Sequence, residues 1–364
     1  MWGAGMPPRS AWDAWVWPLA AAMRVSEAAL KPWSEFLGIP SEEQPAPEEP
    51  TWVTPNTVRI ELPAMRLREF ANGVGTPTLV VTPFALHGAT LADLAPGHSL
   101  VERLLGAGVG PLFLVECKSA TEEMRFFTID SYLADLAIAV EEAGGRANLV
   151  GLCQGGWLSL MFAARFPQKI AQLALAGSPI DLDAARSPMV TGTRMTPPEI
   201  FRGLLDSAGG RMLGRSMQTF WGVPELTPTA TCEVLQEEAP SPDLIERFLA
   251  WHNWTVDLPG AYYLDVVERL FRNNELCRGS FCALGRRLDL SRIDHPLYLL
   301  AARGDEVTPP RQLYAVRRYV ATPRQEIRAA LAAGGHLSLF MGAETLAKEW
   351  ADIAHWLKPS SRTR

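Results

Sequence analysis

The segment Gly151–Gly156 (GLCQGG) holds the residues best suited to covalent chemistry. It follows a short apolar run, Asn148–Leu152, that is typical of a strand, and it precedes Trp157–Phe166, which is typical of a helix. A Gly-x-Cys-x-Gly pattern between a strand and a helix is the context of a nucleophile elbow, with Cys153 in place of the usual serine. We therefore predict that Cys153 is a nucleophile; the alternative is a buried structural cysteine beside a glycine-rich turn.

An elbow of this kind also places electrostatic groups around the sulfur. The positive end of the helix behind Cys153 favours the thiolate form. The backbone N–H of Gln154 is expected to point at the oxyanion that develops during acyl transfer. A second donor is expected in the loop after the predicted strand Thr78–Pro83, from the N–H of Leu86 or His87. For the His87 ring itself, packing or a turn is the favoured role.

A thiol nucleophile needs a base and an acid that orients it, and beside such elbows they follow along the chain in the order nucleophile, acid, histidine. Asp305 lies directly after the predicted strand His295–Ala302, and His336 follows the predicted strand near Gln325–Ala330. Both positions are loops at the carboxyl ends of strands, where catalytic groups gather. We predict Asp305 as the acid and His336 as the base, with Glu306 as a rival acid.

The elements that must position these residues alternate between short buried strands and helices. This alternation predicts an α/β fold with a mostly parallel sheet covered by helices on both faces. From Asp183 to about Leu284 the alternation stops and prolines become frequent, which indicates an inserted cap (183–284) between two parts of one core (51–182 and 285–364). The remaining predicted elements are strands at Leu112–Glu116 and Ala171–Ala176 and helices at Thr128–Ala143 and Ala343–Leu357.

The first 50 residues differ from this body. Five of the twelve tryptophans occur within the first 33 residues: Trp2, Trp12, Trp15, Trp17 and Trp33. The acidic, proline-rich Ser41–Pro50 then resembles a linker. The arm either packs on the body or offers an adhesive surface to a partner, a lipid or a hydrophobic polymer.

Composition excludes several classes of protein. The net charge is −6 and no basic run is present, so nucleic acid is not expected as a partner. The five cysteines show no CxxC pair, which disfavours a zinc site and a disulfide framework and suits a reducing cytoplasm. No metal is expected. The longest uncharged stretch, Ala71–Ala92, contains two prolines and His87, so no transmembrane segment is predicted. No basic leader precedes the apolar stretch Trp15–Met23, which Pro18 interrupts, so no signal peptide is expected.

Several of these motifs together resemble the polyhydroxyalkanoate (PHA) synthases, a family with the α/β-hydrolase fold. The resemblance is strongest to short catalytic subunits that work with a second subunit. It implies a cysteine nucleophile, an aspartate that orients histidine and a histidine base, which correspond to Cys153, Asp305 and His336. The segments that carry it are GLCQGGWLSLMFAARFPQKI with Ser178–Asp181, Phe84–Val101, Trp254–Gly260, Asn273–Leu276, Asp289-Leu290, GDEVTPP and GGHLSLF.

The chain departs from the family at three places. Glu306 follows the aspartate where the family usually has histidine, His87 stands where an oxyanion-loop asparagine is usual, and Glu116-Cys117 replaces Asp-Trp. These differences leave the Cys–His–Asp set intact. They bear on whether the acyl group is polymerised or hydrolysed.

The resemblance implies an acyltransferase that forms an acyl-thioenzyme from 3-hydroxyacyl-CoA and extends a polyester. The alternatives are a cysteine-dependent hydrolase of PHA or a related ester, and a non-catalytic granule protein. We also take Phe84 and Trp157 as candidate substrate-binding residues. No cofactor is expected beyond the coenzyme A thioester substrate. A second synthase subunit, a homodimer and the granule surface are the candidate partners, and the expected location is the cytoplasm, with or without granules.

Overall fold

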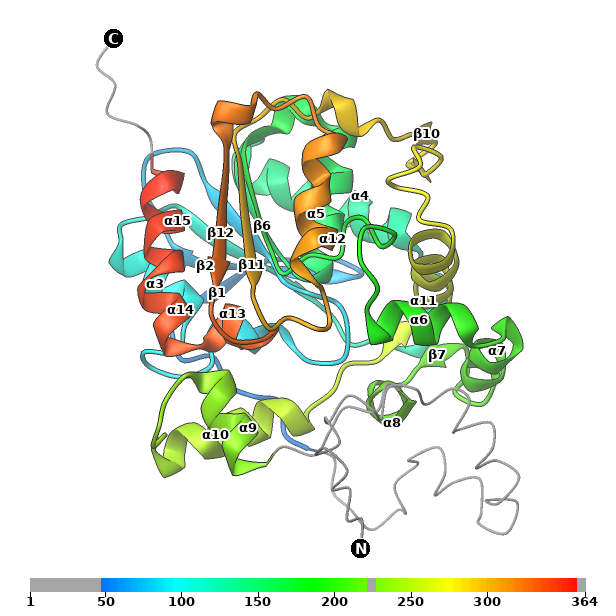
Figure 1. Ribbon diagram of the computed structural model, residues 1–364, viewed down its shortest axis with the longest axis horizontal. Helices are drawn as coiled ribbons and strands as arrows, with labels where there is room; N and C mark the ends of the chain where they lie inside the picture. Colours follow the sequence, from blue (N-terminus) through cyan, green and yellow to red (C-terminus); the bar gives the residue numbers. More distant parts are fainter. Residues whose placement is uncertain (1–46, 221–226, 359–364) are drawn as a thin grey trace, which may run out of the picture.

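The computed structural model describes residues 47–220 and 227–358, and its centre is an eight-stranded sheet (Figure 1). The strand order is β1-β2-β4-β3-β5-β6-β11-β12. Strand β2 runs antiparallel to both of its neighbours, and all other neighbouring pairs are parallel. The strands are β1 (Thr57–Glu61), β2 (Met65–Ala71), β3 (Thr78–Val81), β4 (Leu112–Cys117), β5 (Ala147–Leu152), β6 (Ile170–Ala176), β11 (Leu297–Ala302) and β12 (Ile327–Ala332).

Alternating residues of the central strands face opposite sides of the sheet, and each side buries its own core. On β3, for example, Leu79 and Val81 pack into one core and Val80 into the other. Because both faces are covered, the central strands are apolar almost throughout. This arrangement confirms the predicted α/β fold with a mostly parallel sheet.

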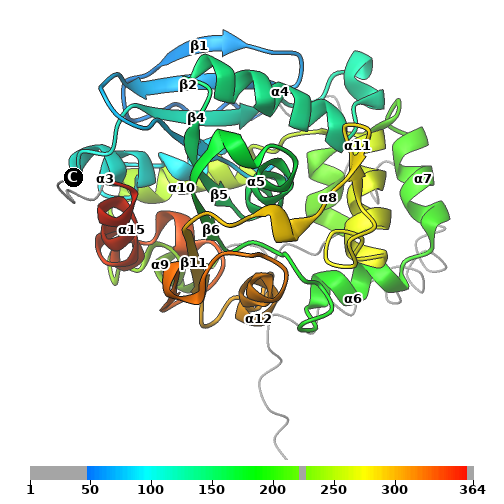
Figure 2. The ribbon, with the colours of Figure 1, turned by 90° about the horizontal axis from the view of Figure 1, so that it is seen from above.

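Helices cover both faces of the sheet, as the view in Figure 2 makes clear. Helices α4 and α5 lie on one face, and α3 and α15 on the other. The bounds are α3 (Leu100–Gly106), α4 (Ile129–Glu142), α5 (Gln154–Arg165), α12 (Pro310–Tyr314), α13 (Ser338–Met341), α14 (Ala343–Ala347) and α15 (Glu349–Leu357).

Apart from residues 221–226, which the structure does not describe, the chain between β6 and β11 adds no strand to the large sheet. It forms two short strand pairs, β7 (Arg211–Met212) with β8 (Leu258–Pro259) and β9 (Cys282–Ala283) with β10 (Arg286–Arg287). The predicted cap, 183–284, falls in this stretch, and its boundaries stay a prediction. Its helices are α6 (Pro188–Met195), α7 (Pro198–Asp206), α8 (Gly214–Phe220), α9 (Pro228–Leu235), α10 (Pro242–Asn253), α11 (Gly260–Asp265) and a π-helix at Val266–Arg272.

Three details differ from the sequence-based expectations. Helix α5 begins at Gln154, earlier than the predicted Trp157. The predicted helix Ala343–Leu357 is two helices, α14 and α15, which are separated at Lys348. The strands β1 and β2 were not predicted. The tryptophan-rich arm lies outside the described residues, and within these no helix is long and apolar enough to cross a membrane.

Candidate active site

Cys153 lies in a sharp turn between β5 and α5. Its backbone has φ 48° and ψ −117°, a conformation that residues with a side chain rarely adopt. The turn is so crowded that a Cβ atom on Gly151, Gly155 or Gly156 would collide, with the backbone of Gly156, the carbonyl of Val81 and the hydroxyl of Ser178 respectively. The glycines are thus required by close backbone approach, which agrees with the predicted elbow.

The loops after β11 and β12 bring Asp305 and His336 together. The Nδ1 atom of His336 lies 2.8 Å from Oδ2 of Asp305, whose side chain is fully buried. The other carboxylate oxygen, Oδ1, accepts the backbone N–H of Thr308 at 2.7 Å. The two loops are also joined directly, because Gly304 N–H donates to the carbonyl of Gly334 at 2.9 Å. This hydrogen bonding fixes the orientation of the imidazole.

The Cys153 sulfur is near enough to His336 to influence the charge of the imidazole. Burial works against the charged imidazole, but the Asp305 carboxylate and the Cys153 sulfur outweigh it and raise the pKa of His336 well above its ordinary value. An imidazole in these surroundings is suited to hold the thiol proton. The rival acid, Glu306, is exposed, and among the described residues it forms no hydrogen bond with His336. The catalytic roles of these residues stay a prediction.

The two predicted sources of oxyanion donors lie at the ends of β5 and β3. Gln154 is the first residue of α5, so its N–H has no partner within the helix. Leu86 has φ 46°, a left-handed conformation. Within the described residues, no hydrogen-bond partner is found for the backbone N–H of Leu86 or His87. The amides of Leu86 and His87 thus meet one requirement of the predicted oxyanion donors, and that role stays a prediction.

The His87 ring packs inside the protein. Its centroid lies 4.5 Å from the ring of Trp251 and 5.1 Å from the ring of His252. Burial, with a smaller contribution from His252, lowers the pKa of His87 to about 3, so the ring is neutral at physiological pH. This packing agrees with the role favoured from the sequence.

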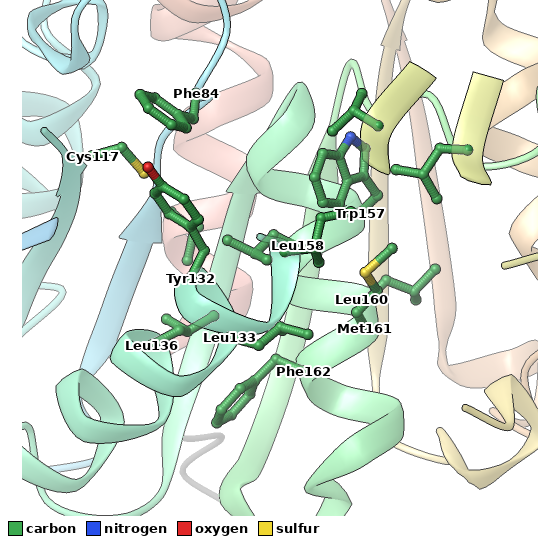
Figure 3. Close-up of a cluster of buried hydrophobic side chains, with 14 of the residues drawn as sticks. Phe84, Cys117, Tyr132, Leu133, Leu136, Trp157, Leu158, Leu160, Met161 and Phe162 are labelled. Atoms are coloured by element: carbon green, nitrogen blue, oxygen red, sulfur yellow. The ribbon is translucent and has the colours of Figure 1, made fainter. Parts of the chain in front are cut away.

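Phe84 and Trp157 are both buried, and Figure 3 shows them among other buried hydrophobic side chains of the core. The ring of Phe84 lies 4.9 Å from Tyr132 and 5.2 Å from Tyr262, and Trp157 stacks on Tyr262 at 6.3 Å. Within the described residues the Trp157 indole N–H has no hydrogen-bond partner. A substrate-binding role for both residues stays a prediction.

Sequence reasoning did not identify two supports of this site. Thr308 orients Asp305 through its backbone, and Trp251 donates its indole N–H to the carbonyl of Gly88 at 3.1 Å. The only local signal for the second contact is the tryptophan-rich stretch around Trp254. Within residues 47–220 and 227–358, no three or more His, Cys, Asp or Glu side chains are grouped to hold a metal ion.

Comparisons with known proteins agree with the fold. The family described as alpha/beta hydrolase fold matches residues 116–343. The poly(3-hydroxyalkanoate) polymerase subunit PhaC of Haloferax mediterranei is 22% identical over 85% of this chain and 65% of its own length. The PhaC subunit of Allochromatium vinosum is 23% identical over 73% of this chain and 76% of its own. These relatives confirm the resemblance indicated by the sequence motifs.

A solved structure shares the fold. The monoacylglycerol lipase of Paleococcus ferrophilus superposes with a TM-score of 0.52 at 17% sequence identity, covering 80% of this chain and 98% of its own. At this identity the similarity extends to the fold alone.

Proposed function

Because this chain belongs to the alpha/beta hydrolase fold family, we propose that it uses the elbow cysteine for acyl transfer from a 3-hydroxyacyl-CoA to a growing polyester. The main support is the 2.8 Å pair of His336 and the Asp305 carboxylate, together with the effect of the Cys153 sulfur on the charge of the same imidazole. Relatives named as poly(3-hydroxyalkanoate) polymerase subunits support the substrate class.

In the first half of the proposed reaction, His336 takes the proton of the Cys153 thiol. The thiolate attacks the thioester carbonyl, and the amides of Gln154 and of the loop at Leu86 and His87 stabilise the resulting oxyanion. The carbon–sulfur bond to coenzyme A then breaks, and His336 returns the proton to the departing thiolate. The product is free coenzyme A and an acyl group on Cys153.

In the second half, His336 takes the proton from a substrate hydroxyl while that oxygen attacks the acyl-cysteine. The bond to sulfur breaks, the thiolate regains the proton, and the polyester is longer by one ester bond. A cysteine suits this sequence because the acyl-enzyme is itself a thioester and keeps its transfer potential. Attack by water at the same step would release a free acid instead.

The test is an incubation of the purified protein with 3-hydroxybutyryl-CoA. Release of coenzyme A together with polymer supports the proposal, and the Cys153→Ala variant serves as the control. If free 3-hydroxybutyrate were the sole acyl product, the protein would be a hydrolase and the proposed acyltransferase function would be wrong. Coenzyme A release that is unchanged in the alanine variant would contradict the role of Cys153.

A further inference from the structure

The loop Phe84–Gly88 is bonded to a distant part of the chain, residues 251–256, which we call the clamp segment. The Trp251 indole N–H donates to the Gly88 carbonyl at 3.1 Å, in a buried contact between residues 163 positions apart. The Val256 N–H donates to the Leu86 carbonyl at 2.9 Å. Two carbonyls of the loop are thus held from outside it.

Side-chain packing reinforces these two bonds. Gly88 lies so close to the Trp254 ring that a Cβ atom on Gly88 would collide with it. The His87 ring is packed against Trp251, which is 1% exposed and stacks on Phe248 of α10 at 5.9 Å. The clamp segment therefore restricts the loop Phe84–Gly88 through hydrogen bonds and through close steric contacts.

The bond from Val256 has a direct consequence for the amide of His87. A trans peptide unit is planar, so the Leu86 carbonyl and the His87 N–H point in opposite directions. Since the carbonyl points at the clamp segment, the His87 N–H points away from it and has no partner among the described residues. Leu86 is held at φ 46°, a conformation that persists only where the surroundings impose it.

We propose that Trp251 is a positioning residue that holds the oxyanion loop for attack on an acyl carbonyl. The proposal rests on the proposed function, in which the loop amides stabilise the oxyanion. If Trp251 has this role, activation of the thiol and stabilisation of the oxyanion depend on different residues. Activation of the Cys153 thiol depends on His336 and Asp305, whereas stabilisation of the oxyanion depends in addition on the clamp segment.

The test compares Trp251→Phe with Trp350→Phe. Trp350 is equally buried and donates its indole N–H to the Leu339 carbonyl at 2.7 Å, so both variants lose one buried bond of the same kind. Acylation is measured from the p-nitrophenyl acetate burst and from coenzyme A release with 3-hydroxybutyryl-CoA. Alkylation of Cys153 by iodoacetamide, which forms no oxyanion, is followed by mass spectrometry of the peptide that contains it.

We expect Trp251→Phe to slow acylation by roughly 10- to 100-fold, less than the roughly 10²- to 10³-fold loss on removing an oxyanion donor outright. Alkylation should stay within about twofold, and KM should change little because the lost interaction acts in the transition state. In Trp350→Phe the ratio of acylation to alkylation should not change. Gly88→Ala, which pushes the loop off the Trp254 ring, should reproduce the selective loss if Trp251→Phe folds poorly.

Two results would overturn this role of Trp251: an unchanged ratio of acylation to alkylation in Trp251→Phe, or an equal change in Trp350→Phe. Failure of the proposed function looks different. The unaltered protein would then give a p-nitrophenyl acetate burst but release no coenzyme A, and the burst would still measure the role of Trp251. Absence of both a burst and coenzyme A release would contradict both proposals.

Discussion

Replacement of Asp305 by asparagine should inactivate the proposed enzyme through the wrong imidazole tautomer. In the protein, Oδ1 of Asp305 accepts the Thr308 N–H and Oδ2 faces Nδ1 of His336. An asparagine would keep its oxygen on the Thr308 N–H, which leaves its NH₂ group facing Nδ1. That nitrogen would then have to accept, so Nε2 would carry the proton and could no longer take one from Cys153.

The size of the effect follows from the geometry of this pair. The two charge centres lie about 4 Å apart, and at an effective dielectric constant of about 20 their attraction is about 4 kcal/mol. The carboxylate side chain is fully buried and that of His336 is 12% exposed, so screening by solvent is weak. Loss of this stabilisation of the imidazolium corresponds to roughly a thousandfold slower acylation.

The assay is the burst of p-nitrophenol from p-nitrophenyl acetate, followed as a function of pH. The direction of the effect on His336 is fixed: without the carboxylate the pKa of His336 falls, so the imidazole holds a proton less well and the burst is expected to be slower at a given pH. Glu306→Gln, which neutralises the exposed neighbour, is the matched control and should retain nearly full activity. If Asp305→Asn kept more than about a tenth of the activity, or if Glu306→Gln were the more damaging, the assignment of the acid would be wrong.

Three further predictions concern Cys153, His87 and the first 50 residues. Cys153→Ser should lose nearly all polymer synthesis but retain some hydrolysis, because an oxygen ester is a poorer acyl donor; synthesis near the original rate, measured as polymer formed per coenzyme A released, would argue against this logic. His87→Asn should reduce the loss of thermal stability between pH 7 and pH 5. Burial lowers the pKa of His87 to about 3 in the folded protein, so below about pH 6.5 this histidine binds a proton in the unfolded chain but not in the folded one. An unchanged difference in melting temperature between the two pH values would contradict that. Removal of residues 1–49 should leave the burst intact and abolish binding to PHA granules in a sedimentation assay, whereas retained binding with a large loss of thermal stability would favour an arm that packs on the body.

The parts of the fold that could be predicted from the sequence are those with a local pattern. The apolar run before Cys153 and the glycines around it are dictated by a buried parallel strand and a crowded turn, and both features are visible in six residues. The sequence analysis predicts neither β1, which is the edge strand, nor its antiparallel neighbour β2. Strand β1 is mostly exposed and carries charged side chains, so its sequence shows neither an apolar run nor a clean alternation.

The candidate site also has one part that could be predicted from the sequence and one part that could not. The order of Cys153, Asp305 and His336 along the chain, with each one at the carboxyl end of a strand, is sufficient to group them, because parallel strands end at one edge of the sheet. The contact between Trp251 and Gly88 has no such signal, since it joins residues 163 positions apart and depends on how the segment between β6 and β11 docks.

If the proposals hold, this docking gives the segment between β6 and β11 a positioning role, because it is bonded to the loop Phe84–Gly88. Its clamp residues hold two carbonyls of the oxyanion loop, while Cys153, Asp305 and His336 are held by the sheet and by the loops that leave it. A ligand or partner that shifts residues 251–256 is therefore expected to change the rate of acylation while the thiol stays equally reactive towards iodoacetamide. A partner that acts on the thiolate–imidazolium pair itself would change both rates together. The ratio of the two rates thus reports which half of the site a partner affects.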